Sequence, residues 1–298
     1  MAFWIVTDAC SDLPTSYVQK QKHFKLVSMS YQVDGVVKDI DPLDPNQEET
    51  ACGFYQKLNE GSSATTFQVA HQDWLDALKP LCEEGHDLLV LPFSSGLSGT
   101  AVSGITAGEE LQAAYPDCKL FVVDTLSASL GLGLLLHYVL AYRDGGKSIE
   151  ECHLYAQELV PKLIHWFTVN DLHFLRRGGR VSTTSAYLGS ILKIKPVLNV
   201  DENGKLIPRE KVRGRKRSLC ALFEKVQTYA SEFETQTIFI SHGGCGDDAN
   251  WLAEKLKAEL GVPDVLISTI GPIIGCHSGP GTVAIFFLGK DDAGRKAL

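Results

Sequence analysis

Short apolar runs alternate with longer segments whose apolar residues follow helical spacing. Phe3–Thr7, Leu88–Phe93 and Leu120–Val123 are such runs, and polar or small residues follow each of them. Buried runs that alternate with helices are typical of parallel strands joined by right-handed crossovers. We therefore predict that the first half of the chain is an α/β domain with a mostly parallel sheet covered on both faces.

Other segments of the first half are predicted from the same patterns. Phe24–Val33 is expected to be one strand leading into an Asp34-Gly35 turn, whereas Gly61–Gln68 is small and polar enough to favour a solvated loop. Helices are expected over residues 47–59 and 126–142. Another helix is expected to begin near His71, and a further one to end at Leu159. Since Leu126–Tyr142 is apolar on nearly all sides, that helix should be buried or border an apolar cavity.

A second set of strands follows His165, and we place a domain boundary near residue 160. The predicted domains are an N-terminal α/β domain, 1–160, and a mixed α/β domain, 161–298. Asp201–Gly204 is predicted to be a hairpin turn. The predicted strands of the second domain are His165–Val169, Ile194–Val200, Lys205–Ile207, Thr237–Ser241, Val265–Ile270 and Val283–Leu288, with helices near 219–226 and 247–260.

Composition narrows the functional classes. A net charge of −8 argues against binding nucleic acid over a broad surface. The eight cysteines include no CxxC pair, so neither a zinc site nor any other metal site is expected, and no cofactor is predicted. The chain enters a strand pattern directly from Met1 and has no apolar run of membrane-spanning length, so we expect a cytoplasmic protein with reduced thiols.

The segment Ser94-Ser95-Gly96-Leu97-Ser98-Gly99-Thr100 lies where a buried strand gives way to a helix. Ligands of α/β sheets bind at such turns, and free N–H groups at a helix start favour anions. Ser94, Ser95 and Ser98 could thus form a small-anion cradle, although glycine and serine also occur in ordinary turns.

Two further segments carry candidate chemistry. Arg176, Arg177 and Arg180 surround a glycine pair and suggest a local positive spot suited to a carboxylate or phosphate, although solvated arginines explain the segment equally well. His277 lies among glycines and prolines where no apolar stripe explains an imidazole. Asp144–Ser148 is not a Walker loop, because position 141 is Ala and the segment follows a helix.

Taken together, these segments resemble the DegV family, the bacterial fatty-acid-binding proteins that include the binding subunit of fatty acid kinase. The similarity extends over nearly the whole chain, and six motifs occur in the family's order. They are Thr7–Leu13, Ser94–Thr100, Val123–Thr125, Leu175–Arg180, Leu192–Pro196 and Gly275–Gly281.

The resemblance implies a two-domain protein that is not itself an enzyme. It would hold one long-chain fatty acid, its tail in a buried tunnel and its carboxylate at the domain junction, and present it to a separate fatty acid kinase that makes an acyl phosphate for phospholipid synthesis. By motif, Thr66, Ser94, Ser95 and His277 would contact the carboxylate. Arg180, Ser98 and Gly279 would lie near the head group and the acyl phosphate, with a protonatable His277 favouring the product.

The chain departs from the family pattern at three places. Ala9 and Phe67 each replace a serine and remove hydroxyls near the expected head site, and Thr125 replaces the serine of a VDS motif. Tail burial still suffices for tight binding, since about 16 carbons at ~0.8 kcal/mol each give on the order of 10 kcal/mol.

Three rival classes remain open. A serine hydrolase acting on a lipid or ester could use Ser98, Asp124 and His277, although the second glycine of its nucleophile elbow comes one residue early. An autonomous small-molecule kinase lacks a phosphate-binding glycine motif of the usual forms. A transcriptional regulator is disfavoured by the acidic charge.

Overall fold

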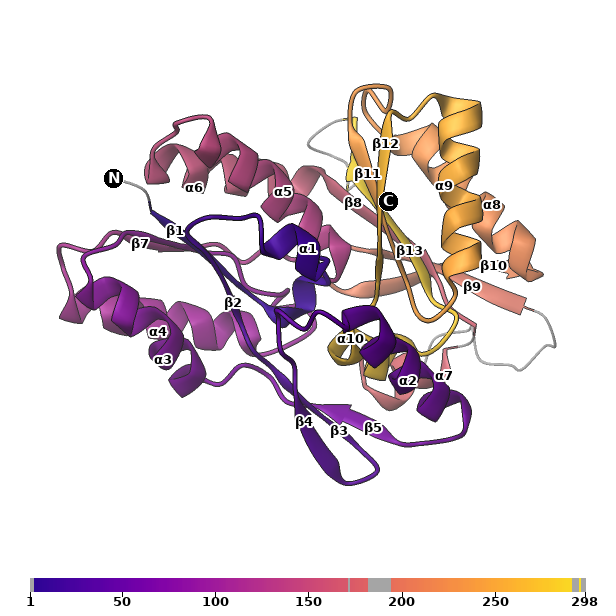
Figure 1. Cartoon of the computed structure of the whole chain (residues 1–298). Helices are drawn as coiled ribbons and strands as arrows, with labels where there is room; N and C mark the ends of the chain where they lie inside the picture. The colour runs from indigo at the N-terminus through magenta and orange to yellow at the C-terminus, as the bar shows by residue number, and fades with distance from the viewer. Residues whose placement is uncertain (1–2, 171, 182–193, 291–294, 296–298) are drawn as a thin grey trace.

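The computed structural model describes residues 3–170, 172–181, 194–290 and 295. Figure 1 shows two larger sheets side by side, with a small third sheet below them. The chain has an α/β fold with a parallel N-terminal sheet and a mixed C-terminal one, so the predicted fold class is confirmed.

The N-terminal sheet has four parallel strands in the order β2-β1-β6-β7. Because alternate strand residues face opposite sides, Val6 and Ile5 enter separate cores on the two faces. One core contains α3 and α4, and the other contains α5 and α6, as expected for a sheet covered on both faces. The bounds are β1 (Trp4–Asp8), β2 (Phe24–Val27), β6 (Leu88–Val90), β7 (Leu120–Val122), α3 (His71–Glu83), α4 (Thr100–Ala114), α5 (Leu130–Asp144) and α6 (Ile149–Leu159).

The C-terminal sheet has six strands in the order β10-β9-β8-β13-β11-β12, and only β11 and β12 pair in parallel. Helices α8 and α9 cover its outer face, whereas α5 packs against its inner face. The bounds are β8 (Leu163–Thr168), β9 (Ile194–Val200), β10 (Leu206–Arg213), β11 (Thr237–His242), β12 (Asp264–Thr269), β13 (Val283–Leu288), α8 (Arg215–Tyr229) and α9 (Gly246–Leu260).

Helix α5 is the apolar helix that the sequence predicts to be buried. It contacts β8, β11 and β13 as well as the core of the first sheet, so one continuous core joins the two halves. The domain boundary near residue 160 stays a prediction.

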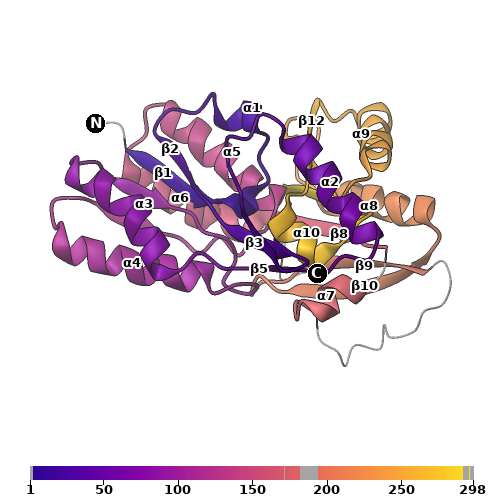
Figure 2. The ribbon, with the colours of Figure 1, turned by 60° about the horizontal axis from the view of Figure 1, so that its bottom comes forward.

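The third sheet is antiparallel and has the order β4-β3-β5. Helix α10 comes from the C-terminal half but packs against β3, β5, α2 and α7, and Figure 2 shows it between the two halves. The bounds are β3 (Ser30–Val33), β4 (Val36–Asp39), β5 (Ala64–Thr66), α1 (Thr15–Val18), α2 (Gln47–Asn59), α7 (His173–Arg177), α10 (Pro272–Ser278) and 3-10 turns at Ala9–Ser11 and Val160–Lys162.

Two strand predictions are corrected. Phe24–Val33 is two strands, because β2 joins the parallel sheet and β3 the antiparallel one. Gly61–Gln68 is not wholly a solvated loop, since Ala64–Thr66 forms β5 against β3. An apolar pattern does not specify which neighbour a strand will pair with, and this pairing places Thr66 opposite Tyr31.

One predicted helix starts later than expected, and one further helix was not predicted. Helix α5 begins at Leu130 rather than Leu126, because Leu126 and Ser129 both have positive φ angles and form a turn before it. Residues Pro272–Ser278 form a helix, with the proline at a first-turn position where no N–H is needed. Leu192 and Lys193 of the predicted motifs, and the start of the chain at Met1-Ala2, lie outside the described residues.

Candidate functional site

A cavity of about 590 Å³ lies where the two larger sheets meet α10. Cavities of this size are in the range that holds small ligands. Its lining is mostly apolar and includes Phe93, Leu97, Phe167, Ile274 and Phe286. The predicted site residues Thr66, Ser98, Arg180 and His277 also line it, although they come from four distant parts of the chain.

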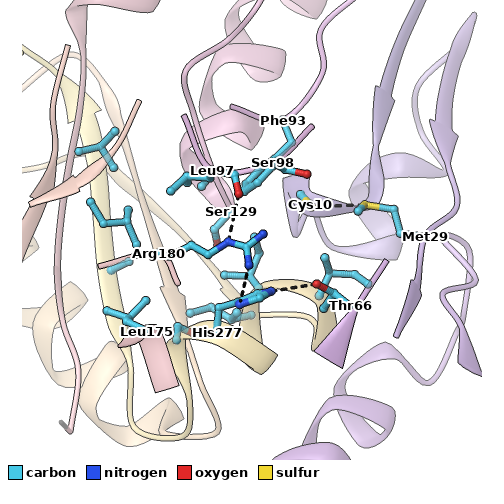
Figure 3. A pocket seen from close by; sticks show the side chains of 18 of the residues that line it. Cys10, Met29, Thr66, Phe93, Leu97, Ser98, Ser129, Leu175, Arg180 and His277 are labelled. Carbon is cyan, nitrogen blue, oxygen red and sulfur yellow. Dashed lines mark hydrogen bonds between the residues drawn. The ribbon is translucent and has the colours of Figure 1, made fainter. Parts of the chain in front are cut away.

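Three of these side chains interact directly and form what we call the Thr66–His277–Arg180 cluster. The Thr66 Oγ1 atom lies 2.9 Å from His277 Nε2, and Arg180 Nη1 lies 3.5 Å from His277 Nδ1. Figure 3 shows the imidazole between the hydroxyl and the guanidinium. The last residue of β5, the segment after α7 and helix α10 therefore meet at one imidazole.

The arrangement selects one tautomer of His277. A guanidinium can only donate, so Nδ1 must accept from Arg180 and the ring proton must be on Nε2. Nε2 then donates to Thr66 Oγ1, which leaves the Thr66 hydroxyl proton available for a ligand.

Burial, followed by the charges of Arg180 and Arg177, lowers the pKa of His277 to about 4. The imidazole is therefore neutral at pH 7, and its surroundings disfavour the protonated form that was expected to help the product. Positive charge at the site comes from Arg180, whose guanidinium stays ionised.

Arg180 is held by backbone oxygens. Its Nε donates to Leu97 O (3.0 Å) and its Nη1 donates to Gly178 O (2.6 Å). Within the described residues no acidic side chain forms an ion pair with it, and Nη2 has no hydrogen-bond partner there. A half-buried cation that keeps an open donor can accept a carboxylate or phosphate.

The loop after β6 is arranged differently from the predicted anion cradle. The buried Ser94 hydroxyl donates to Gly204 O (3.0 Å), and Ser95 is exposed, with its N–H donating to Asp124 Oδ1 (3.1 Å). Neither residue lines the cavity. A Cβ at Gly96 would lie 2.3 Å from Asn203 O, so this glycine makes room for the β9–β10 turn rather than for a ligand.

Ser98 faces the cavity but is not an activated nucleophile. Its Oγ lies 3.0 Å from Thr100 Oγ1 and accepts from Thr100 N at the start of α4. Asp124 accepts from the backbone of Ser95 and Leu126, and His277 contacts Thr66 and Arg180. The Ser98–His277–Asp124 hydrogen-bond chain that a serine hydrolase requires is therefore absent from these described residues.

Gly279 has a packing role at the end of α10. Its φ is +76°, and a Cβ there would lie 2.4 Å from the Phe174 ring. It does not line the cavity, so its predicted place beside the head group is not supported by the geometry.

Two buried carboxyl groups of the Thr7–Leu13 motif form hydrogen bonds that connect segments around the cavity. Asp8 accepts from the backbone N–H of Cys10 (2.9 Å) and Phe93 (2.7 Å). Asp12 accepts from Gly271 N (2.9 Å) and from the Ser129 hydroxyl (2.6 Å), which ties the end of β1 to the starts of α10 and α5. Asp8 thus caps the 3-10 turn at Ala9–Ser11 and braces the loop that follows β6.

Burial raises the pKa of Asp12 to about 7 and that of Asp8 to about 6, despite these hydrogen bonds. The unfolded chain releases the Asp12 proton near pH 4, whereas the folded chain keeps it until about pH 7. The stabilisation that the Asp12 carboxyl contributes is therefore complete at low pH and decreases as the pH rises from about 4 to about 7.

We predict that the free energy of unfolding falls less steeply between pH 5 and 8 in Asp12→Asn than in the wild type, the difference being about 2 kcal/mol. The amide can still accept from Gly271 N and can donate to Ser129. Chemical denaturation at several pH values measures the slope, with Asp41→Asn as the exposed control. An unchanged slope in Asp12→Asn would contradict the assignment.

Sequence reasoning missed several lining residues. Cys10 Sγ lies 3.4 Å from Met29 Sδ at the N-terminal side of the cavity (Figure 3), and Ser129 and His165 also line it. Asp12 was visible within a motif, but no local pattern marks Ser129 or His165, because the cavity forms only when distant segments pack.

The described residues give two negative findings. No helix within 3–170, 172–181 and 194–290 is long and apolar enough to cross a membrane. In the same part of the chain, no group of three or more His, Cys, Asp or Glu side chains could hold a metal ion.

Comparison with known proteins gives consistent matches over nearly the whole chain. A family model described as "Uncharacterised protein, DegV family COG1307" matches residues 2–290. A DegV domain-containing protein of Clostridium perfringens is 42% identical over 287 residues, covering 96% of this chain and 97% of the relative.

Solved structures also match over nearly the whole chain. Protein TM841 from Thermotoga maritima, reported to reveal a fatty acid binding function, is 30% identical with a TM-score of 0.82, covering 96% of this chain and 98% of that one. The Streptococcus pneumoniae Fatty Acid Kinase (Fak) B3 protein loaded with linoleic acid has a TM-score of 0.82 over 97% of this chain and 99% of that one. At 22% identity, this second likeness shows the fold alone.

Proposed function

Since the chain belongs to the DegV family, we propose that it binds one long-chain fatty acid in the interdomain cavity, with the carboxylate at the Thr66–His277–Arg180 cluster. The observation that carries this proposal is a mostly apolar cavity beside which a hydroxyl proton and a guanidinium nitrogen are left unpaired. The fatty-acid-binding relative from Thermotoga maritima supports the same ligand class.

The physical chemistry of the cavity matches such a ligand. Burying an acyl tail of about 16 carbons yields on the order of 10 kcal/mol, which offsets much of the cost of association. The carboxylate loses its hydration shell on entering and needs strong donors in exchange. Thr66 Oγ1 and Arg180 Nη2 supply a neutral and a charged donor on two sides of His277.

We further propose that the chain is not itself an enzyme and that it presents the bound acid to a separate fatty acid kinase. Two observations support this role: the hydrolase hydrogen-bond chain is missing, and the positive charge at the site is a fixed guanidinium rather than a titrating base. An acyl phosphate carries more negative charge than the acid, so Arg180 would favour the product.

Native mass spectrometry of the purified protein tests the binding proposal. A stoichiometric adduct that is extracted by solvent and identified as a fatty acid is the expected result, and it also gives the chain length. A protein that stays free of ligand after incubation with saturated and unsaturated acids would overturn the proposal.

The role of Arg180 is tested with the kinase present. We predict that Arg180→Ala lowers acyl-phosphate formation at least about tenfold more than it lowers fatty-acid affinity, because the charge matters most for the product. Arg176→Ala, which removes an exposed arginine nearby, is the control. Equal losses in turnover and affinity for Arg180→Ala would contradict product stabilisation.

A further inference from the structure

His165 is a polar residue in the part of the cavity bounded by the C-terminal sheet. It lies on β8, is 2% exposed and lines the cavity on the same strand face as Phe167. Its ring packs edge-to-face against Phe286 (5.3 Å between ring centroids). A Cβ at Gly131 would lie 1.9 Å from His165 Nε2, so only glycine on the facing helix leaves room for this imidazole.

Neither ring nitrogen of His165 has a hydrogen-bond partner among the described residues. The Leu163 carbonyl is the smallest influence on the ring and favours its protonation, but neither ring nitrogen forms a hydrogen bond with it; this oxygen accepts from Arg295 Nε (2.6 Å). Burial and the nearby Arg295 charge hold the pKa of His165 well below its usual range. The ring is thus a neutral imidazole, with one donor and one acceptor enclosed in an apolar environment.

A polar group buried without a partner costs about 1–3 kcal/mol. No packing need explains the imidazole here, because a leucine or phenylalanine would fill the same space without this cost. The unpaired nitrogens therefore point to a partner that arrives with the ligand.

The position of His165 along the cavity can be estimated from the strand register. Thr282 lines the cavity, and its Oγ1 donates to the backbone oxygen of Ser278 (3.0 Å), the residue after His277. His165 is paired with Phe286, four residues further along the chain from Thr282. Four strand residues span roughly 13 Å. An extended acyl chain covers about 1.25 Å per carbon with single bonds of about 1.5 Å, so His165 stands near the tenth carbon.

We propose that the cavity is built for a long-chain fatty acid that carries a hydroxyl group near the middle of its chain, and that His165 is the residue that recognises it. A hydroxyl both donates and accepts, so it can pair with either nitrogen of a neutral imidazole. This inference rests on the proposed function, because it takes the carboxylate to lie at the Thr66–His277–Arg180 cluster. An unsubstituted chain would leave His165 unpaired or would need a trapped water molecule.

The test compares 10-hydroxyoctadecanoic acid with octadecanoic acid by displacement of a fluorescent fatty acid from delipidated protein. The wild type should prefer the hydroxy acid, and His165→Phe should lower this preference about tenfold or more. His165→Gln, which keeps a donor and an acceptor, should retain part of it. Phe167→Leu alters the same strand face without removing polarity and should shift both affinities alike.

A second measurement needs no variant. In the wild type, 10-hydroxyoctadecanoic acid should bind more tightly than its 3-hydroxy isomer, because only the former places its hydroxyl at His165. If the wild type binds both octadecanoic acids equally, or if His165→Phe keeps the wild-type preference, the inference is wrong while the proposed function stands. If no long-chain acid of either kind binds, both are wrong.

Discussion

Replacing Thr66 by valine is expected to weaken fatty-acid binding by about tenfold to a hundredfold and to leave the stability of the protein nearly unchanged. The substitution keeps the shape of the side chain but removes the hydroxyl proton that His277 leaves free. A hydrogen bond to a charged group contributes about 1.5–3 kcal/mol, which corresponds to that range of affinities. Titration of delipidated protein with a fatty acid of the identified chain length measures the change.

The neighbouring residue offers a matched control. Thr65 precedes Thr66 on β5, is exposed and does not line the cavity, so Thr65→Val makes the same chemical change on the opposite face of the strand. Thermal unfolding of both variants would separate a loss of binding from a loss of folding. Wild-type affinity in Thr66→Val would show that the carboxylate lies elsewhere in the cavity.

The sequence was sufficient to predict the layers of the fold. Short apolar runs such as Leu88–Val90, bounded by turn residues, are typical of buried strands, and the apolar helix α5 was expected to be buried. Pairing partners were not predictable, because no turn signal separates β2 from β3 in the sequence although they join different sheets. That choice depends on contacts with α2 and α10, which lie elsewhere in the chain.

The residues of the candidate site were likewise only partly predictable from the sequence. Motif resemblance led to Thr66, Arg180 and His277, and the structure places all three in one cluster. The same resemblance led to Ser94 and Ser95, which the structure places away from the cavity. A serine at a strand-to-helix turn can bind a ligand or brace a loop, and only the position of Gly204 shows that Ser94 does the latter.

His277 illustrates what charge patterns cannot reveal. The sequence places arginines and a histidine in the same half of the chain, but the order of donors and acceptors emerges only from distances. Because Nδ1 of His277 accepts from Arg180, its Nε2–H donates to Thr66 and orients the Thr66 hydroxyl. His277 therefore acts as a neutral donor and acceptor and carries no charge. Its position should therefore matter more than its ability to titrate.

Changing Gly178 to alanine is expected to lower fatty-acid affinity about tenfold or more with little effect on stability. Gly178 has an ordinary φ of −75°, so alanine fits its backbone, but the added Cβ would lie 2.2 Å from His277 Nδ1. The imidazole must then move and lose its alignment with Thr66 and Arg180. Fatty-acid titration and thermal unfolding of the same preparation measure the two effects.

Gly179→Ala is the matched control, because the two glycines are adjacent and their constraints are opposite. Gly179 has a φ of +71° with open space around a Cβ, so alanine there strains the backbone by about 1–2 kcal/mol without touching the cluster. Gly178→Ala should therefore affect binding, whereas Gly179→Ala should affect stability. If Gly178→Ala bound fatty acid like the wild type, the position of His277 would not govern binding, and the carboxylate would have to be held by Arg180 alone or at another part of the cavity.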